Sequence, residues 1–212
     1  MATLQDLSKA VIAGKANKVK RLVNELLEEK VAPLDIINSG LIGGMVEVGV
    51  RFKANQMFVP EVLMSAQAME AGTDIVKPLM NVDEVQDIGS VLLGTVKGDL
   101  HDIGKNLVGM MLESVGFKVI NAGIDVSPEA FVEGVKEHKP DVVAMSALLT
   151  TTMLHMKDTI ELLKEEGLRD SVKVIIGGAP VSQDFADEIF ADGFAPDAVS
   201  ATDLCKKLLG IS

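Results

Sequence analysis

From Thr3 to about Met80, apolar positions recur every three or four residues, the period of amphipathic helices, and strand-like alternation is missing. The pattern breaks at Gly14, at Val31–Pro33 and at Ala54–Pro60. Pro33 and Pro60 are well placed as first-turn residues. We therefore predict four helices joined by short loops into an antiparallel bundle, near Leu4–Ala13, Asn17–Glu29, Pro33–Phe52 and Pro60–Val76.

The second half of the chain has a different pattern, in which short β-rich runs alternate with helical stretches. The predicted strands are Ser90–Thr95, Lys118–Asn121, Val142–Ser146, Lys173–Gly177 and a short fifth strand near Asp197–Val199. The predicted helices are Ile103–Ser114, Ser127–Glu137, Met153–Glu166, Gln183–Ala191 and Ala201–Leu209. This alternation is typical of a parallel sheet with helices on both faces. We expect a flavodoxin-like or Rossmann-like α/β unit of five strands in the order 2-1-3-4-5.

Between the two patterns, Lys77–Asp87 combines a proline with scattered acidic residues and has no apolar period, which indicates an interdomain linker. The chain is therefore expected to hold a helical domain over 1–80, a linker over 81–88 and the α/β domain over 89–212.

Charge and composition exclude several classes of function. The net charge of -11 argues against nucleic acid or an anionic membrane surface as a partner. No apolar run approaches the roughly 20 residues of a membrane span, and the polar start lacks a signal-peptide pattern, so a cytoplasmic location is expected. Cys205 is the single cysteine, which excludes a disulfide framework and a thiolate metal cluster. A metal would have to be held by nitrogen or arrive inside a cofactor.

The predicted topology draws attention to two loops, because ligands of such sheets bind outside the carboxyl ends of the first and third strands. The first loop, Val96–Gly104, contains Asp99, His101 and Asp102. A histidine there can offer one ring nitrogen to a metal while the other donates to a carboxylate, and Asp99 is the natural partner. Asp102 is expected to be the N-cap of the next helix. The alternative is that both aspartates are helix caps and His101 is an ordinary loop residue.

The second loop, Ala147–Thr152, follows Ser146 and is rich in hydroxyl groups. These hydroxyls suit hydrogen bonds to a polar cofactor tail or a relay from Asp99, or alternatively they cap the helix that begins near Met153. After the fourth strand, Gly177 and Gly178 allow close approach of a bulky group, although a turn-forming pair is the usual explanation.

Three segments, Thr95–Gly109, Ser146–Met153 and Val174–Pro180, closely resemble the cobalamin-binding domain shared by methionine synthase and the small corrinoid proteins of methyltransferase systems. The resemblance implies a cobalamin or related corrinoid cofactor, such as methylcobalamin or hydroxocobalamin. It makes His101 the lower axial ligand of the cobalt, Asp99 its hydrogen-bond partner, and Thr152 the counterpart of a relay serine. The other cofactor-binding positions that it implies are Leu100, Asp102, Ile103, Gly104, Ser146, Leu148, Thr150, Gly177 and Gly178.

The resemblance extends into the first half, where Val50–Met69 is similar to the end of a helical cap that shields the upper face of the cobalt. It implies cofactor contacts for Phe52, Phe58, Val59 and Val62. From periodicity alone, these are apolar residues at helical spacing and belong more often to a core.

The resemblance implies that the chain is a methyl-carrying subunit of one-carbon metabolism rather than a complete enzyme. A substrate-specific methyltransferase would load the methyl group, a second methyltransferase would pass it to a thiol or to tetrahydrofolate, and a reductive activator would be a further partner. The run SALLTTTM and the cap sequence favour a methylamine or betaine as the methyl donor.

Two alternatives remain open. A cobalamin-sensing regulator usually carries a DNA-binding helical domain with a basic face, which this acidic chain lacks. A receiver or nucleotide-binding module without corrinoid would need an acceptor aspartate where Ser146 ends the third strand, or a G-x-G-x-x-G pattern in the first loop.

Overall fold

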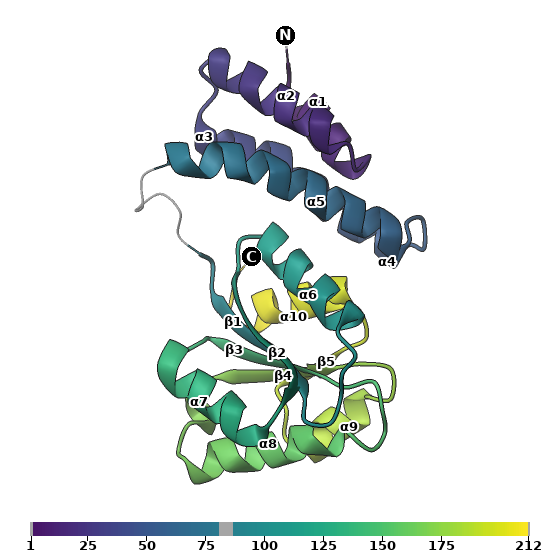
Figure 1. Cartoon of the computed structure of the whole chain (residues 1–212), viewed down its shortest axis with the longest axis vertical. Helices are drawn as coiled ribbons and strands as arrows, with labels where there is room; N and C mark the ends of the chain where they lie inside the picture. Colours follow the sequence, from purple (N-terminus) through teal and green to yellow (C-terminus); the bar gives the residue numbers. More distant parts are fainter. Residues whose placement is uncertain (1, 81–86, 212) are drawn as a thin grey trace. The chain divides into compact units, whose positions relative to one another are not determined.

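The computed structural model describes residues 2–80 and 87–211 (Figure 1). The chain divides into two compact units, Met1–Gln86 and Asp87–Ser212. The linker predicted over 81–88 falls mostly on residues 81–86, which lie outside the described residues. Among the described residues, no helix has the length and apolar character needed to cross a membrane.

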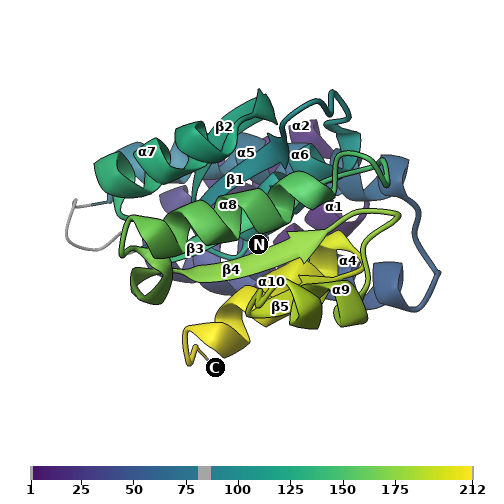
Figure 2. The ribbon, with the colours of Figure 1, turned by 90° about the horizontal axis from the view of Figure 1, so that it is seen from below.

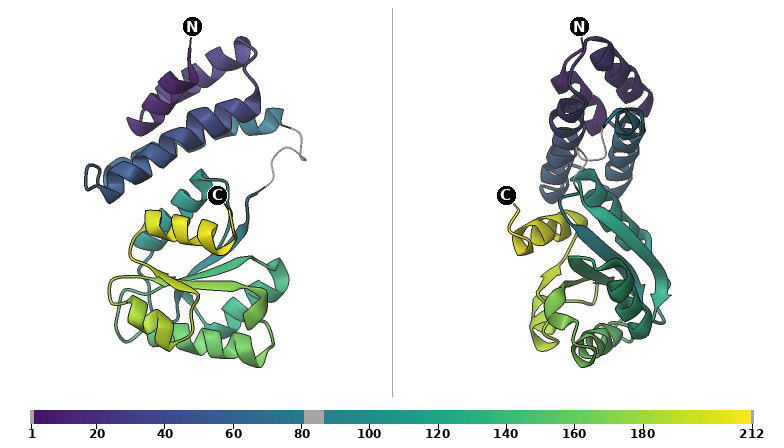
Figure 3. Two further views of the ribbon diagram at one scale, coloured as in Figure 1. Left: turned by 180° about the vertical axis from the view of Figure 1, so that it is seen from behind. Right: turned by 90° about the vertical axis from the view of Figure 1, so that its left-hand side faces the viewer.

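The first unit is helical, as predicted, and its helices pack into a bundle (Figure 3). Its elements are α1 (Leu4–Ile12), α2 (Ala16–Glu28), α3 (Pro33–Asp35), the π-helix η1 (Ile36–Ile42), α4 (Gly43–Lys53), α5 (Val59–Val76) and the short 3-10 helix η2 (Lys77–Leu79). The core is aliphatic and fully buried, with Leu7, Leu26 and Met45 among its members.

The stretch predicted as one helix, Pro33–Phe52, contains a π-helical segment that periodicity did not indicate. Two glycines, one in η1 and one at the start of α4, let this part of the chain lie close to α1. A Cβ at Gly40 would lie 2.6 Å from Leu7 Cδ2, and one at Gly44 would lie 2.8 Å from Val11 Cβ. Larger residues at these two positions would force the helices apart.

The second unit is a five-stranded, all-parallel sheet in the predicted order β2-β1-β3-β4-β5 (Figure 2). The strands are β1 (Ser90–Val96), β2 (Lys118–Val126), β3 (Val142–Ser146), β4 (Lys173–Gly177) and β5 (Gly193–Ala195). The central strands β1 and β3 are apolar runs buried on both sides, as strands of a covered parallel sheet must be.

Helices cover both faces of this sheet (Figure 1). One apolar layer joins Phe131 of α7 (Pro128–His138), Met156 of α8 (Leu154–Glu165) and Ala186 of α9 (Gln183–Glu188). The layer on the other face joins Leu112 of α6 (Ile103–Ser114) to Cys205 of α10 (Ala198–Leu208). A short 3-10 helix, η3 (Arg169–Ser171), precedes β4.

Two sequence-based expectations on the strands were wrong. The fifth strand is Gly193–Ala195 rather than Asp197–Val199, because Asp197 instead caps α10 by accepting a hydrogen bond from the Ser200 N–H at 2.8 Å. Strand β2 also extends to Val126, five residues beyond the prediction. It lies at the sheet edge, where exposed polar residues such as Asn121 and Asp125 hide the strand pattern.

Candidate functional site

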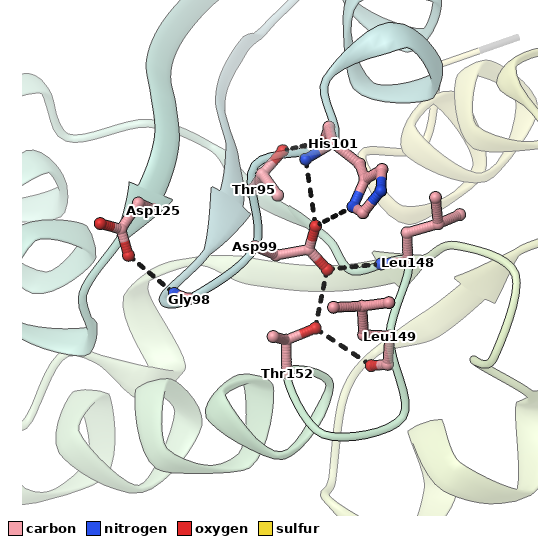
Figure 4. A network of polar contacts seen from close by, with 8 residues as sticks. All are labelled: Thr95, Gly98, Asp99, His101, Asp125, Leu148, Leu149 and Thr152. Atoms are coloured by element: carbon pink, nitrogen blue, oxygen red, sulfur yellow. Dashed lines mark hydrogen bonds and ion pairs between the residues drawn. The ribbon is translucent and has the colours of Figure 1, made fainter.

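Asp99 is the centre of a polar network in the loop after β1 (Figure 4). Its side chain is completely buried. Oδ1 accepts hydrogen bonds from His101 Nδ1 at 2.7 Å and from the His101 N–H at 3.1 Å. Oδ2 accepts from the Thr152 hydroxyl and from the Leu148 N–H, both at 2.7 Å. The loops after β1 and β3, the two predicted from topology, are therefore joined through one carboxylate.

These four donors control the charge of Asp99. Burial alone would raise the pKa of Asp99, but the hydrogen bonds from Thr152, Leu148 and His101 outweigh it and hold the pKa far below its usual range. Asp99 is therefore a carboxylate, which can only accept. His101 Nδ1 must then carry a proton, and in the neutral ring Nε2 keeps its lone pair.

The second ring nitrogen of His101 belongs to a half-exposed side chain. The side chain of His101 is 52% exposed, and Nε2 has no hydrogen-bond partner among the described residues. Thr95, completely buried at the end of β1, donates from Oγ1 to the His101 carbonyl oxygen at 2.9 Å and so fixes the backbone under the ring. Sequence reasoning missed Thr95, whose only signal is a hydroxyl at the end of a strand.

The side chains beside His101 are apolar and unusually exposed. Leu100 is 67% exposed, Ile103 75% and Leu148 44%. No cluster of three or more His, Cys, Asp or Glu side chains suited to a bare metal ion occurs in the described part of the chain. The arrangement of one histidine nitrogen among apolar side chains suits a metal that arrives inside a large, apolar-faced complex.

The caps expected in the two loops are only partly present. Asp102 occupies the N-cap position of α6, but its side chain makes no cap hydrogen bond and instead accepts from Asn106 Nδ2 at 3.0 Å. Met153 precedes α8, and no side chain caps that helix. The Thr152 hydroxyl donates to Asp99 and to the Leu149 carbonyl oxygen, so of the two alternatives for this hydroxyl the contact with Asp99 is present and the cap of α8 is not.

Three glycines predicted to lie along a cofactor channel differ in their surroundings. A Cβ added at Gly104 would meet no atom within 4 Å, so the chain itself leaves space beside this residue. A Cβ at Gly177 would lie 2.8 Å from the Ala195 carbonyl oxygen. A Cβ at Gly178 would overlap the carbonyl oxygen of Ala147. Packing within the protein therefore requires glycine at 177 and 178, whereas at 104 it does not.

The remaining predicted positions are placed as follows. Ser146 is half-buried and Thr150 exposed, and neither hydroxyl has a hydrogen-bond partner among the described residues. In the helical unit, Phe58 is 68% exposed, and Phe52 and Val59 are half-buried. Val62 is buried.

Comparison with known proteins covers nearly the whole chain. Residues 89–202 match a family model described as a B12 binding domain, and residues 3–77 match a second model with the same description. A corrinoid protein of Desulfitobacterium hafniense is 45% identical over 99% of both chains. The dimethylamine corrinoid protein of Methanosarcina barkeri is 47% identical over 97% of both.

Solved structures agree with these matches. A cobalamin-binding protein from Desulfitobacterium hafniense superimposes with a TM-score of 0.82 at 32% identity, covering 98% of both chains. The methanol:cobalamin methyltransferase complex MtaBC from Methanosarcina barkeri gives a TM-score of 0.88 at 29% identity, over 99% of this chain and 80% of that chain.

Proposed function

Because the chain belongs to the B12-binding corrinoid proteins, we propose that it carries a methyl group between two partner methyltransferases on a corrinoid held by His101. The cofactor is a cobalamin or a related corrinoid. When bound, it supplies a cobalt that accepts a methyl group and passes it on. The protein supplies the ligand, the surroundings of the cofactor and the docking surface.

The residues of the second unit fit this group. The Nε2 atom of the half-exposed His101 suits a nitrogen ligand to cobalt, and Asp99 fixes the ring tautomer that leaves the lone pair of this nitrogen free. This contact is the observation that carries the proposal. Leu100, Ile103 and Leu148 suit the apolar edge of a corrin ring. The open space at Gly104 and the unpaired hydroxyls of Ser146 and Thr150 suit the polar tail.

The chain's own contribution to methyl transfer is control of one proton. Binding through Nε2 requires the neutral imidazole, and a proton on Nε2 prevents it. Because the four donors keep Asp99 ionised, the carboxylate accepts from His101 Nδ1, which holds the ring proton there and leaves Nε2 as the ligating nitrogen. Thr152 acts through Asp99 in this network. Its hydroxyl donates to Asp99 Oδ2 at 2.7 Å and so can serve as the counterpart of the relay serine.

The helical unit is proposed as the cap. Phe58, with most of its surface exposed although it is aromatic, is the strongest of the four predicted contacts. Val62 is the weakest, since its side chain is already buried. An apolar cap would exclude water from the cofactor between encounters with partners.

Among methyl donors, we favour a methylamine. Relatives named for dimethylamine reach 47% identity and one named for trimethylamine 44%, whereas the methanol system's structure is 29% identical. A betaine donor, a thiol or tetrahydrofolate acceptor, a reductive activator and a cytoplasmic location stay predictions from the sequence.

The axial ligand is tested by labelling the histidines of the full chain and of its His101→Ala variant with 15N, reconstituting both with hydroxocobalamin and reducing both to the cobalt(II) state. We expect electron paramagnetic resonance to show splitting by one axial 15N nucleus in the wild type and none in the variant, whereas the cofactor's own unlabelled base would give the 14N pattern. Equal spectra would exclude His101 as the ligand, and a colourless wild-type protein would favour a module without corrinoid. Methyl transfer from a panel of purified donor-specific methyltransferases then identifies the donor.

A further inference from the structure

The end of strand β2 departs from a regular parallel ladder. Residues Leu93, Gly94 and Val96 of β1 pair with Asn121, Gly123 and Val126 of β2. Strand β2 therefore contains one extra residue at each of two places. Such bulges re-aim side chains and are common next to functional sites. Here they bring the residues before Val126 toward the loop that carries His101.

Within the second bulge, between Gly123 and Val126, Asp125 has a left-handed backbone with φ of 53°. Non-glycine residues rarely adopt this conformation, although Asp and Asn tolerate it best. Strained residues of this kind persist where their surroundings determine them, and they cluster at functional sites. This conformation allows Asp125 to contact the loop that carries His101.

Asp125 binds the His101 loop through two hydrogen bonds. Its Oδ1 accepts from the Gly98 N–H at 2.7 Å, and its own N–H donates to the Asp99 carbonyl oxygen at 3.0 Å. Figure 4 shows Asp125 at the start of the loop, on the opposite side from Leu148 and Thr152. Asp99 is thus held by its side chain from the β3 side and by its backbone from the β2 side.

The bulged segment is itself anchored. Asn121 Oδ1 accepts from the Gly123 N–H at 3.0 Å and from Lys105 Nζ at 2.8 Å. Lys105 is 2% exposed and belongs to the first turn of α6, the helix that follows the His101 loop. Strand β2 therefore contacts the chain on both sides of His101, through Asp125 before it and through Asn121 after it.

We infer that Asp125 is a positioning residue for cobalt ligation, which fixes the backbone of Gly98 and Asp99 and through them the His101 ring. The inference rests on the proposed function, since it assumes that His101 is the ligand. A merely structural role would stabilise the fold and leave the ligation unchanged.

A matched pair of variants separates the two roles. Asp125→Asn keeps an oxygen acceptor for Gly98 and tolerates the left-handed backbone, whereas Asp125→Gly keeps the backbone without strain and removes the acceptor. The full chains, with their histidines labelled with 15N, are reconstituted with hydroxocobalamin and reduced to cobalt(II) at pH 7. We expect Asp125→Asn to match the wild type, and the ratio of cobalt ligated by 15N-histidine to all other cobalt to fall roughly five- to tenfold in Asp125→Gly.

The outcomes are distinguishable. An unchanged ratio in Asp125→Gly, beside a ligated wild type, would overturn the inference and leave the proposed function intact. A wild type without an axial histidine nitrogen would overturn both. The corrinoid-free proteins give a second readout by nuclear magnetic resonance. Two results support the inference. The Gly98 amide is protected from hydrogen exchange in the wild type, and the His101 ring signals shift in Asp125→Gly but not in Asp125→Asn. An unprotected Gly98 amide or identical ring signals overturn it.

Discussion

A buried carboxylate, Asp99, lies 2.7 Å from Nδ1 of a histidine, His101, whose other ring nitrogen has no hydrogen-bond partner among the described residues. The two side chains differ in burial, and this difference gives the pair its chemistry. Asp99 is completely buried and cannot exchange its partners for water, whereas the His101 side chain is 52% exposed and open to a ligand. The protein thus fixes one nitrogen firmly and leaves the other available.

Replacing Asp99 with Asn should destabilise the corrinoid-free protein. The NH2 group of Asn would replace one carboxylate oxygen and so face two of the four donors that now bind the carboxylate. We expect the free energy of unfolding to fall by about 1–3 kcal/mol, measured by urea unfolding followed by circular dichroism. Asp102→Asn is the control, because its exposed contact with Asn106 should be worth less than about 0.5 kcal/mol. Equal losses in both variants would contradict the central place of Asp99.

The free energy of unfolding should depend on pH in the way expected for the lowered pKa of Asp99. Its pKa is lowered by folding, so its contribution is present above the ordinary value near 3.9 and is lost as pH falls toward the folded value. The stability difference between wild type and Asp99→Asn should therefore be constant above about pH 5 and shrink progressively below it. Unfolding measured from pH 7 to pH 3 checks this, and a gap that widens in acid would reverse the assigned direction.

Thr152 allows a test of the relay position with two conservative changes. Thr152→Ser keeps the hydroxyl that donates to Asp99, and Thr152→Val keeps the shape but removes it. We expect the serine variant to lie within about 0.5 kcal/mol of the wild type. The valine variant should lose about 1.5–3 kcal/mol, the range for a hydrogen bond to a charged group. Chemical unfolding distinguishes them, and a neutral valine variant would show that Leu148 and His101 suffice to hold Asp99.

Much of this site follows from the sequence for a definite reason. Strand order and the spacing of Asp99 and His101 are local or topological properties, and both predictions describe what the structure contains. Asp125 could not be predicted, because its contact with Gly98 depends on two bulges in an edge strand whose exposed residues carry no apolar pattern. The π-helical segment Ile36–Ile42 could not be predicted for a similar reason, because its close packing depends on α1, which is remote in the sequence.

Gly178 should prove essential to the fold rather than to the cofactor. Its φ of 125° lies in the region that favours glycine, and a Cβ there would overlap the Ala147 carbonyl oxygen. We expect Gly178→Ala to lower the free energy of unfolding by more than about 2 kcal/mol in the corrinoid-free protein. Calorimetry without corrinoid checks this, and a normally stable variant that binds hydroxocobalamin poorly would instead support the channel-lining role.

Gly104 should behave in the opposite way, because no atom of the protein lies near the position of its missing Cβ. It belongs to the first turn of α6, where alanine is more favourable than glycine by about 0.5–1 kcal/mol, so Gly104→Ala should be as stable as the wild type or more stable. If the space beside Gly104 receives the corrinoid, the same methyl group should weaken hydroxocobalamin binding at least about tenfold, the effect of roughly 1.4 kcal/mol. Gly43→Ala, another helical glycine with room for a Cβ, is the control and should change stability alone. Unaltered corrinoid affinity in Gly104→Ala would mean that the cofactor does not occupy this space.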